Sequence, residues 1–557
     1  MGEAAVGKNA RRVARRAAWV AGAIALLTTL TFVAFPGHTY LHSDTQIYLP
    51  ILQRLNDPPV LARDFVAERP HVSFTIYDEA ALALHRLGVS FETALVSQQA
   101  IFRALGLLGI WLAALALGLT DRMAMLAAAA LALGATIAGP TVLAIEYEPV
   151  PRGFALPLLL LAMGLAAHGR DLGAGIAASV AFLYHPPSVV TFWAVYFALS
   201  LWPSKPQVMR RRIAGLAPLA AGVAAMFILS RMQPAIAEPQ PFFGRIGADL
   251  ERIQRLRAPY CWVSTWAAEL MPRYAFLWLA AMVAYARVRK HAPQDLRFFL
   301  VGLPLAGMLA VPASYILLER MKWVVAPQLQ PARALVFVTI VAALLAAAAG
   351  LIAAARGRWA EALLWLALAY AIPMDVRLTP VVESPARLAL AAGLAGLAAL
   401  AAWSEAKRFR WSYAPWAAAL IAPFLLIPAW GGVPAQANKP QPEILELAGW
   451  ARASTPPDAV FLFADARKGT APGEFRARAL RAIYVDWKGG GQANFLPQFA
   501  NEWWLRWNRT GEGRFKAWHL PAYRRWGIDY IVLAPANRLP GRTPVFENSA
   551  YLVYRTE

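Results

Sequence analysis

The sequence contains few charged residues and almost no cysteine. Charged residues make up 16% of its 557 positions, whereas an average soluble protein carries about a quarter. This shortage excludes an ordinary cytosolic enzyme. The single cysteine, Cys261, excludes a disulfide within the chain. No group of cysteine and histidine residues has the spacing of a zinc site.

Acidic residues are scarcer than basic ones. The chain has 33 Asp and Glu against 54 Lys and Arg, which gives a formal net charge of +21. Such a charge would indicate nucleic-acid binding in a soluble protein. Here the basic residues cluster at the ends of apolar segments, as membrane topology signals do. We therefore expect no nucleic-acid partner.

Apolar residues dominate the first three quarters of the chain. Hydrophobic residues make up 59% of the sequence, a composition that excludes a disordered chain. They fall in blocks of roughly 18–25 residues up to Trp430, the length of a membrane-spanning helix. After Gly431 the composition becomes that of a soluble domain. The sequence predicts a polytopic α-helical membrane protein (residues 1–430) with a small C-terminal α/β domain (residues 431–557).

About thirteen spans are expected, and residues 172–184 give the weakest signal. The first follows a basic N-terminus and lacks a small-x-small cleavage site, so we expect a retained signal anchor with a cytoplasmic N-terminus. Alternation then places the densest basic clusters in the cytoplasm and the first loop (37–91) and C-terminal domain outside. The expected spans lie near 17–35, 92–118, 123–140, 153–168, 172–184, 188–202, 213–230, 266–286, 298–318, 333–354, 359–372, 386–403 and 413–430.

The C-terminal region alternates helix and strand signals. A helix is expected over Pro442–Ser454 and strands over Ala459–Phe463, Ala482–Val485 and Ile528–Leu533. A hairpin turn is expected at Glu547–Ser549. Several tryptophans in this region suit a membrane interface, a sugar-binding surface or ordinary packing. Lys488 and the three glycines after it follow a strand but lack the spacing of a known phosphate-binding loop.

Asp44 is the first candidate for chemistry, because it directly follows the first span. An aspartate there can take a proton from an acceptor hydroxyl or help to hold a divalent cation. Ser43 and Asp44 also precede an amphipathic stretch, so Asp44 can instead cap a helix. Local sequence favours the cap.

Two further outer segments carry ionisable residues. Glu146, Glu148 and Arg152 lie within seven residues at the mouth of a span. The arginine can bind a phosphate or pair with either glutamate. His185, at the outer end of another span, can contact a phosphate or a substrate hydroxyl, or simply be a capped, solvated histidine.

The outer segment 319–333 contains Arg320, Lys322 and Arg333. Positive charge is disfavoured on the outer face of a membrane protein, so these residues are candidates for binding an anionic headgroup. Arg333 is favoured because it follows Pro331 at the start of a span. The alternative for Arg333 is an ion pair with a carboxylate of an outer loop, such as Glu319.

Taken together, this layout resembles the GT-C superfamily of integral-membrane glycosyltransferases. His42, Ser43 and Asp44, with Tyr48, occupy the position of the acidic motif in the first loop of that family. The segment from Glu146 to Arg152 falls where its second acidic loop lies. The segment Leu329–Ala334 and several C-terminal runs resemble those of uncharacterised bacterial relatives.

The resemblance implies an inverting transfer of a sugar from a polyprenyl-phosphate-linked donor at the outer face of a bacterial inner membrane. Asp44 would be the base, and Arg333, with Arg152 or Lys322, would stabilise the leaving phosphate. His42, Glu146, Glu148 and His185 would complete the substrate site. The acceptor can be a glycan, a lipid or a protein. A lipid or glycan transporter or flippase, and a non-catalytic scaffold for envelope assembly, are the alternatives.

Overall fold

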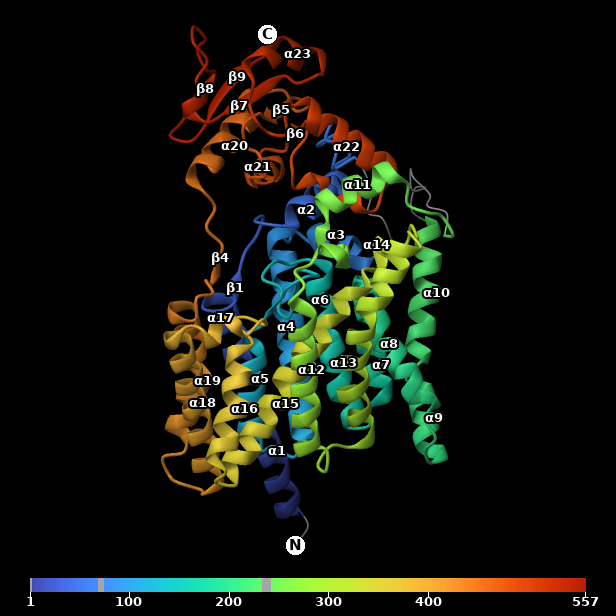
Figure 1. Cartoon of the computed structure of the whole chain (residues 1–557), viewed down its shortest axis with the longest axis vertical. Helices are drawn as coiled ribbons and strands as arrows, with labels where there is room; N and C mark the ends of the chain where they lie inside the picture. Colours follow the sequence, from blue (N-terminus) through green and yellow to red (C-terminus); the bar gives the residue numbers. More distant parts are fainter. Residues whose placement is uncertain (1–2, 69–74, 233–241, 557) are drawn as a thin grey trace.

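The computed structural model describes residues 3–68, 75–232 and 242–556, so His71 of the first loop lies outside the described residues. A bundle of long helices makes up most of the molecule, and a C-terminal region lies at one end of it (Figure 1). The N-terminus lies at the opposite end of the bundle.

Each predicted span coincides with a helix in the described part of the chain. The helices are α1 (Glu3–Val33), α4 (Phe91–Ala116), α5 (Asp121–Ala132), α6 (Pro151–Ala167), α7 (Asp171–Tyr184), α8 (Pro186–Leu201), α10 (Ala217–Met232), α12 (Leu270–Val288), α13 (Gln294–Ser314), α15 (Leu335–Ala355), α16 (Trp359–Ala371), α18 (Pro385–Ala406) and α19 (Tyr413–Trp430). A short helix, α9 (Pro206–Ala214), precedes α10.

Seven helical segments in the described ranges are long and apolar enough to cross a membrane. They are Arg11–Val33, Phe91–Ala116, Pro206–Arg231, Gln294–Arg320, Ala326–Ala355, Pro385–Ala406 and Tyr413–Trp430. The shorter apolar helices are α6, α7, α8 and α16. The prediction of a polytopic helical membrane protein is confirmed.

The helix α5 ends well before its predicted boundary. The span expected over 123–140 stops at Ala132, and the chain then forms a hairpin of β2 (Thr136–Ile137) and β3 (Val142–Leu143). Gly139 in its turn has a φ of +85°, a conformation that glycine adopts without strain. The turn brings Glu146 and Glu148 back toward the start of α6.

Small residues let the central helices approach closely. The alanine-rich α15 is buried along almost its whole length and packs against α12, α13, α16 and α18. Gly109 of α4 faces α6, where a side chain would collide with the backbone of Leu160 and Leu161. Such contacts are typical of membrane helix pairs. They hold α4 against α6, whose first turn carries Arg152.

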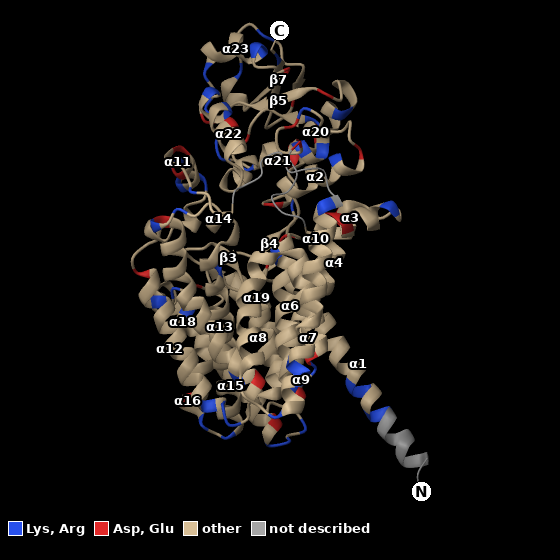
Figure 2. Cartoon of the chain, turned by 90° about the vertical axis from the view of Figure 1, so that its right-hand side faces the viewer, with Lys and Arg blue, Asp and Glu red and all other residues tan. Residues whose placement is uncertain are grey.

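The predicted outer connections lie at the same end as the C-terminal region (Figure 1). They contain α2 (Thr45–Asn56), α3 (Ile76–Arg86), α11 (Ala248–Arg257), α14 (Ala326–Leu329) and α17 (Thr379–Val382), with 3₁₀ turns at Pro259–Cys261, Val263–Thr265 and Pro331–Ala334. A π-helical turn, Tyr315–Arg320, continues α13. Figure 2 shows lysine and arginine gathered at both ends of the molecule, while the middle of the bundle is almost free of charge.

The C-terminal region forms a small α/β unit, as expected. Its five-stranded sheet has the order β6-β5-β7-β9-β8, with β5, β6 and β7 parallel. The strands are β5 (Val460–Phe463), β6 (Ala482–Ile483), β7 (Tyr530–Leu533), β8 (Phe546–Glu547) and β9 (Leu552–Arg555). The antiparallel β8–β9 pair contains the predicted hairpin turn. The helices are α20 (Pro442–Ser454), α21 (Ala471–Ala479), α22 (Pro497–Arg509) and α23 (Leu520–Arg525), with 3₁₀ turns at Gly489–Asn494, Ala517–His519 and Pro535–Asn537.

The first loop is built into this C-terminal unit. Its strand β1 (Gly37–His38) pairs in parallel with β4 (Gln436–Ala437). Further along, Asp64 accepts hydrogen bonds from Arg476 Nε at 2.8 Å and from the backbone N–H of Ile483 at 2.8 Å. The ring of Phe65 stacks on Phe499, with 4.3 Å between the centroids. The division at residues 430 and 431 stays a prediction, and the loop and the C-terminal region share one core.

Candidate active site

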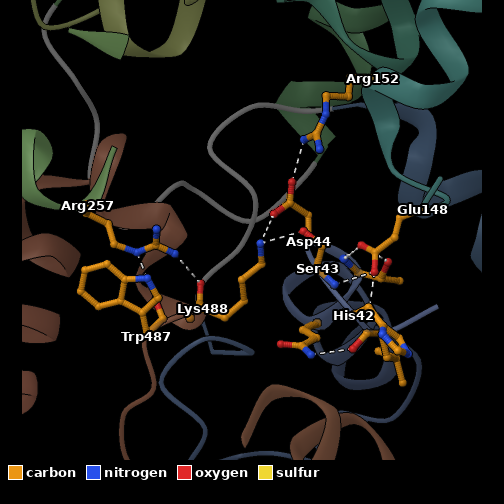
Figure 3. A network of polar contacts seen from close by, with 12 residues as sticks. His42, Ser43, Asp44, Glu148, Arg152, Arg257, Trp487 and Lys488 are labelled. Atoms are coloured by element: carbon orange, nitrogen blue, oxygen red, sulfur yellow. Dashed lines mark hydrogen bonds and ion pairs between the residues drawn. The ribbon is translucent and has the colours of Figure 1, made fainter. Parts of the chain in front are cut away.

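Asp44 lies where the first loop, the helical bundle and the C-terminal region meet (Figure 3). Its Oδ2 accepts a hydrogen bond from Arg152 Nη1 at 2.7 Å, and its Oδ1 accepts one from Lys488 Nζ at 2.6 Å. Arg152 belongs to the first turn of α6, and Lys488 directly precedes the 3₁₀ turn Gly489–Asn494. Two cations from distant parts of the chain therefore hold one carboxylate.

The side chain of Asp44 does not cap α2, which corrects the interpretation that local sequence favours. The helix begins at Thr45, but the Asp44 carboxylate makes no capping hydrogen bond. Glu148 takes this role instead. Its carboxylate accepts the backbone N–H groups of His42 (2.7 Å), Ser43 (2.5 Å) and Thr45 (3.1 Å) and the hydroxyl of Thr45 (2.8 Å).

The two carboxylates have opposite pKa shifts. Burial raises the pKa of Glu148 more than its hydrogen bonds to the turn lower it. Burial would also raise the pKa of Asp44, but the charges and hydrogen bonds of Lys488 and Arg152 outweigh it and hold that pKa well below its usual range. Asp44 is therefore ionised in this arrangement.

Arg152 joins Asp44 to Glu146. It donates from Nε to Glu146 Oε1 at 2.6 Å and from Nη2 to Oε2 at 3.3 Å. The backbone carbonyl of Glu146 accepts hydrogen bonds from Gln99 (2.9 Å) and Arg103 (2.6 Å) on α4. A small cavity beside this group is lined by Arg103, Glu146 and Arg152 and otherwise mostly by apolar side chains of α4 and α6. Of the two pairings open from sequence, the structure shows the one with Glu146.

The two candidate histidines have different surroundings. His185 is the N-cap of α8, and its Nδ1 lies 2.8 Å from Ser188 Oγ. Burial, with the nearby charges of Arg333 and Arg152, lowers the pKa of His185 to about 3, so its ring is neutral. His42 donates its backbone N–H to Glu148, and among the described residues its buried Nε2 has no hydrogen-bond partner.

Arg333 does not form the ion pair with Glu319 that was its alternative. Glu319 instead pairs with Arg255 at 3.5 Å and accepts the N–H of Ser264 at 2.8 Å. The guanidinium of Arg333 lies 5.5 Å from the centroid of the Tyr260 ring. Its buried Nε has no hydrogen-bond partner within the described ranges.

Arg333 and Asp44 both lie near the hydroxyl of Tyr260. The pKa of Tyr260 is raised to about 12, first by burial, and the charges of Arg333, Asp44 and Arg257 all act on this hydroxyl. The structure therefore brings Arg333 to the same neighbourhood as Asp44.

Lys322 points into a different cluster. Its Nζ pairs with Glu251 of α11 at 2.6 Å, and its side chain is 43% exposed. None of the contacts described for Lys322 reaches Asp44. Its assignment to the substrate site stays a prediction without geometric support.

Lys488 and Arg257 belong to the contact network around Asp44 and were not among the site residues predicted from the sequence. Arg257 donates from Nε to the carbonyl of Trp487 at 3.1 Å and from Nη2 to the carbonyl of Lys488 at 3.2 Å. It also lies over the Trp487 ring at 4.8 Å (Figure 3). The glycine run after Lys488 was a weak signal for this turn, whereas nothing local distinguishes Arg257 from other basic residues of its loop.

The site has an excess of positive charge. Arg152 and Lys488 contact Asp44, and the charges of Arg257 and Arg333 act with that of Asp44 on the nearby Tyr260. Glu148 is occupied by the N–H groups and the hydroxyl of the turn. Such a site suits a phosphate, because guanidinium and ammonium groups bind it through charge-assisted hydrogen bonds. In the described part of the chain, no group of three or more His, Cys, Asp or Glu residues is arranged to hold a metal ion.

Comparisons with known proteins give a short sequence match and a long structural one. Residues 442–510 match a family described as "Domain of unknown function (DUF6798)", and no curated protein matches the chain. The structure is similar to crystal structures of ArnT from Cupriavidus metallidurans in the apo state (TM-score 0.46, 12% identity) and bound to undecaprenyl phosphate (TM-score 0.47, 15% identity). Each match covers 97% of this chain and 98% of the ArnT chain.

Proposed function

We propose that this protein transfers a sugar from a polyprenyl-phosphate-linked donor to an acceptor at the extracytoplasmic end of its helical bundle. The observation that carries the proposal is the position of Asp44 among cations at the end of an apolar bundle. A lipid-linked phosphate places its chain in the membrane and its headgroup at this level. The family resemblance in the sequence supplies the donor class.

In this reaction Asp44 acts as the general base. The acceptor hydroxyl attacks the anomeric carbon of the sugar while Asp44 takes the hydroxyl proton. The bond between that carbon and the donor phosphate oxygen breaks, and the phosphate leaves with the electron pair. Attack opposite the leaving group inverts the anomeric configuration. Arg152 and Arg333 stabilise the charge that develops on the phosphate.

His42 and His185 complete the proposed site as neutral groups. His185 is neutral because its pKa is about 3, so it can interact with a sugar hydroxyl but adds no charge. The buried Nε2 of His42 is available to a substrate hydroxyl. Glu146 and Glu148 act indirectly, since Glu146 orients Arg152 and Glu148 fixes the turn that presents Asp44.

The test is whether the donor accumulates when Asp44 is inactive. The gene is deleted in the source organism, and the strain is complemented with wild type, Asp44→Asn or Asp57→Asn. Asp57 is a matched control because it is an exposed aspartate at the other end of α2. Membrane lipids are then searched for polyprenyl-phosphate sugars by mass spectrometry, with protein levels checked by immunoblot.

We expect a polyprenyl-phosphate sugar to accumulate in the deletion strain and with Asp44→Asn, but not with wild type or Asp57→Asn. Full complementation by Asp44→Asn would support the scaffold alternative. If no such lipid accumulates in the deletion strain, the proposal that the donor is a polyprenyl-phosphate sugar is wrong.

A further inference from the structure

The two cations that hold Asp44 are not equally fixed. Arg152 makes two hydrogen bonds to Glu146 besides its contact with Asp44. The ammonium group of Lys488 donates to Asp44 Oδ1 at 2.6 Å and to the Ser43 hydroxyl at 3.0 Å. A lysine ammonium is a point charge on a flexible stem of four carbons. Lys488 is therefore the cation that can leave Asp44 at lower cost.

The backbone beneath Lys488 is held in place. Arg257 bonds to the carbonyls of Trp487 and Lys488 and lies over the Trp487 ring. The turn that follows is buried, and Gly490 has no room for a side chain beside Trp503. The base of Lys488 is thus fixed close to Asp44, and only its side chain needs to move.

The contact between Lys488 and Asp44 conflicts with the role proposed for Asp44. A general base works best when its pKa is near the working pH, but two bound cations hold the pKa of Asp44 well below its usual range. Removing one cation makes the carboxylate a stronger base. An incoming phosphate offers Lys488 a competing anion in the same site.

We propose that Lys488 is a phosphate ligand of the donor site, supplied by the C-terminal region, and that it exchanges Asp44 for the donor phosphate when the donor binds. This inference rests on the proposed function. Before donor binding, Lys488 neutralises Asp44. After the exchange, the lysine charge stabilises the leaving phosphate, and Asp44 is free to take the acceptor proton.

The exchange makes a specific prediction for binding energies. If Lys488 must leave Asp44 to bind phosphate, then Asp44 competes with the ligand for the same cation. Removing the Asp44 charge should strengthen phosphate binding while Lys488 is present and have much less effect when it is absent. A simple repulsion between Asp44 and the phosphate would weaken binding equally with and without Lys488. A double-mutant cycle of Asp44 and Lys488 therefore distinguishes competition for the lysine from repulsion.

The experiment measures binding of undecaprenyl phosphate to the full-length protein in nanodiscs. The variants are wild type, Asp44→Asn, Lys488→Gln and the double variant. Lys488→Arg keeps a cation in place and tests whether charge restores binding. Lys516→Gln is the matched control, because it removes a lysine charge elsewhere in the C-terminal region, beside Trp518. Thermal unfolding confirms that each variant is folded.

We expect Lys488→Gln to weaken binding about 10-fold or more, as is typical for loss of a charged hydrogen-bond partner. Asp44→Asn should tighten binding in the Lys488 background and change it little in the Lys488→Gln background. Lys488→Arg should retain most of the affinity, and Lys516→Gln all of it. If Lys488→Gln binds like wild type, or Asp44→Asn acts equally in both backgrounds, the inference is wrong while the donor class stands. If wild type does not bind the lipid, the proposed function itself fails.

Discussion

Asp44 belongs to the turn of residues 42–45, and Glu148 contacts this turn from another loop. The two carboxylates contribute differently to its stability. Glu148 accepts four hydrogen bonds there, whereas Asp44 makes no capping bond. Glu148→Gln presents an amide N–H₂ to groups that are themselves donors, so we expect a loss of about 2–3 kcal/mol in unfolding free energy. Asp44→Asn loses the charge that pairs with Arg152 and Lys488, but these side chains are 19–25% exposed, so it should cost less than Glu148→Gln, about 1 kcal/mol, and lower the transfer rate about 10²–10⁴-fold. Thermal unfolding and transfer assays on both variants check this, and equal destabilisation by the two would contradict it.

The pKa of Asp44 gives a prediction for pH dependence. Lys488 and Arg152 hold this pKa well below its usual range, and transfer needs the ionised carboxylate. The rate therefore falls only when pH drops through that lowered value. Lys488→Gln removes one cation and raises the pKa of Asp44, so the acidic limb of kcat/KM should move to higher pH. An unchanged limb in a pH–rate series would show that Asp44 does not set it.

Arg333 is expected to act on the donor. A lysine at this position keeps the charge but loses the planar pair of donors that grips a phosphate. Arg333→Lys should therefore lower kcat/KM for the donor about tenfold and leave acceptor KM unchanged. Arg377→Lys is the control, because Arg377 pairs with Asp375 at 2.8 Å in a different connection between helices. The measurement is steady-state kinetics with donor and acceptor varied separately. An unchanged dependence of the rate on donor concentration in Arg333→Lys would show that Arg333 does not bind the donor.

Residues close to a span end were predictable, whereas contacts between distant segments were not. Asp44, Glu146 and Arg152 were candidates because ionisable groups at a membrane boundary are costly unless used. Lys488 lies 444 residues from Asp44 in the chain, and no local pattern encodes that contact. The capping role was misassigned for the same reason, since Glu148 reaches the α2 turn from another loop.

At the scale of elements, hydrophobicity predicted the spans well. The surface of such a helix is apolar all round, because it either packs against other helices or faces lipid. The helices missed in the C-terminal region, α21, α22 and α23, all have a proline in their first turn. Proline is tolerated there, since the first N–H groups of a helix have no partner within it. In α21 a glycine follows the proline, and the pair resembles a turn in sequence.

The junction between α21 and the first loop depends on one buried arginine. Arg476 pairs with Asp64 and with Asp486, and all three side chains are almost fully buried. Arg476→Met leaves two carboxylates without their cation, so we expect a loss of about 3–5 kcal/mol. The neighbouring Arg478→Met removes a more exposed pair with Glu474 and should cost about 0–1 kcal/mol. Denaturant unfolding of the two variants makes the comparison, and similar losses would contradict it.

For the whole molecule, topology can be tested with cysteine labelling. Cys261 is buried and is replaced by serine in the background. Trp518→Cys lies on the C-terminal region, where Trp518 is 74% exposed, and Arg408→Cys lies in the exposed turn between α18 and α19. An impermeant maleimide should label position 518 in intact spheroplasts and position 408 only after permeabilisation. The reverse pattern would place the site in the cytoplasm and overturn the proposed function.

The bond between Asp64 and Arg476 joins residues that are 412 positions apart, which has a consequence for biogenesis. At about 5–20 residues per second, the ribosome needs roughly 20–80 s to add the partner after the first loop has been made. During that interval Asp64 and Phe65 lack the C-terminal surface that buries them. A chain that terminates before Arg476 leaves this segment without the partners that bury it. This segment of the first loop is therefore buried only after the C-terminal region has been synthesised.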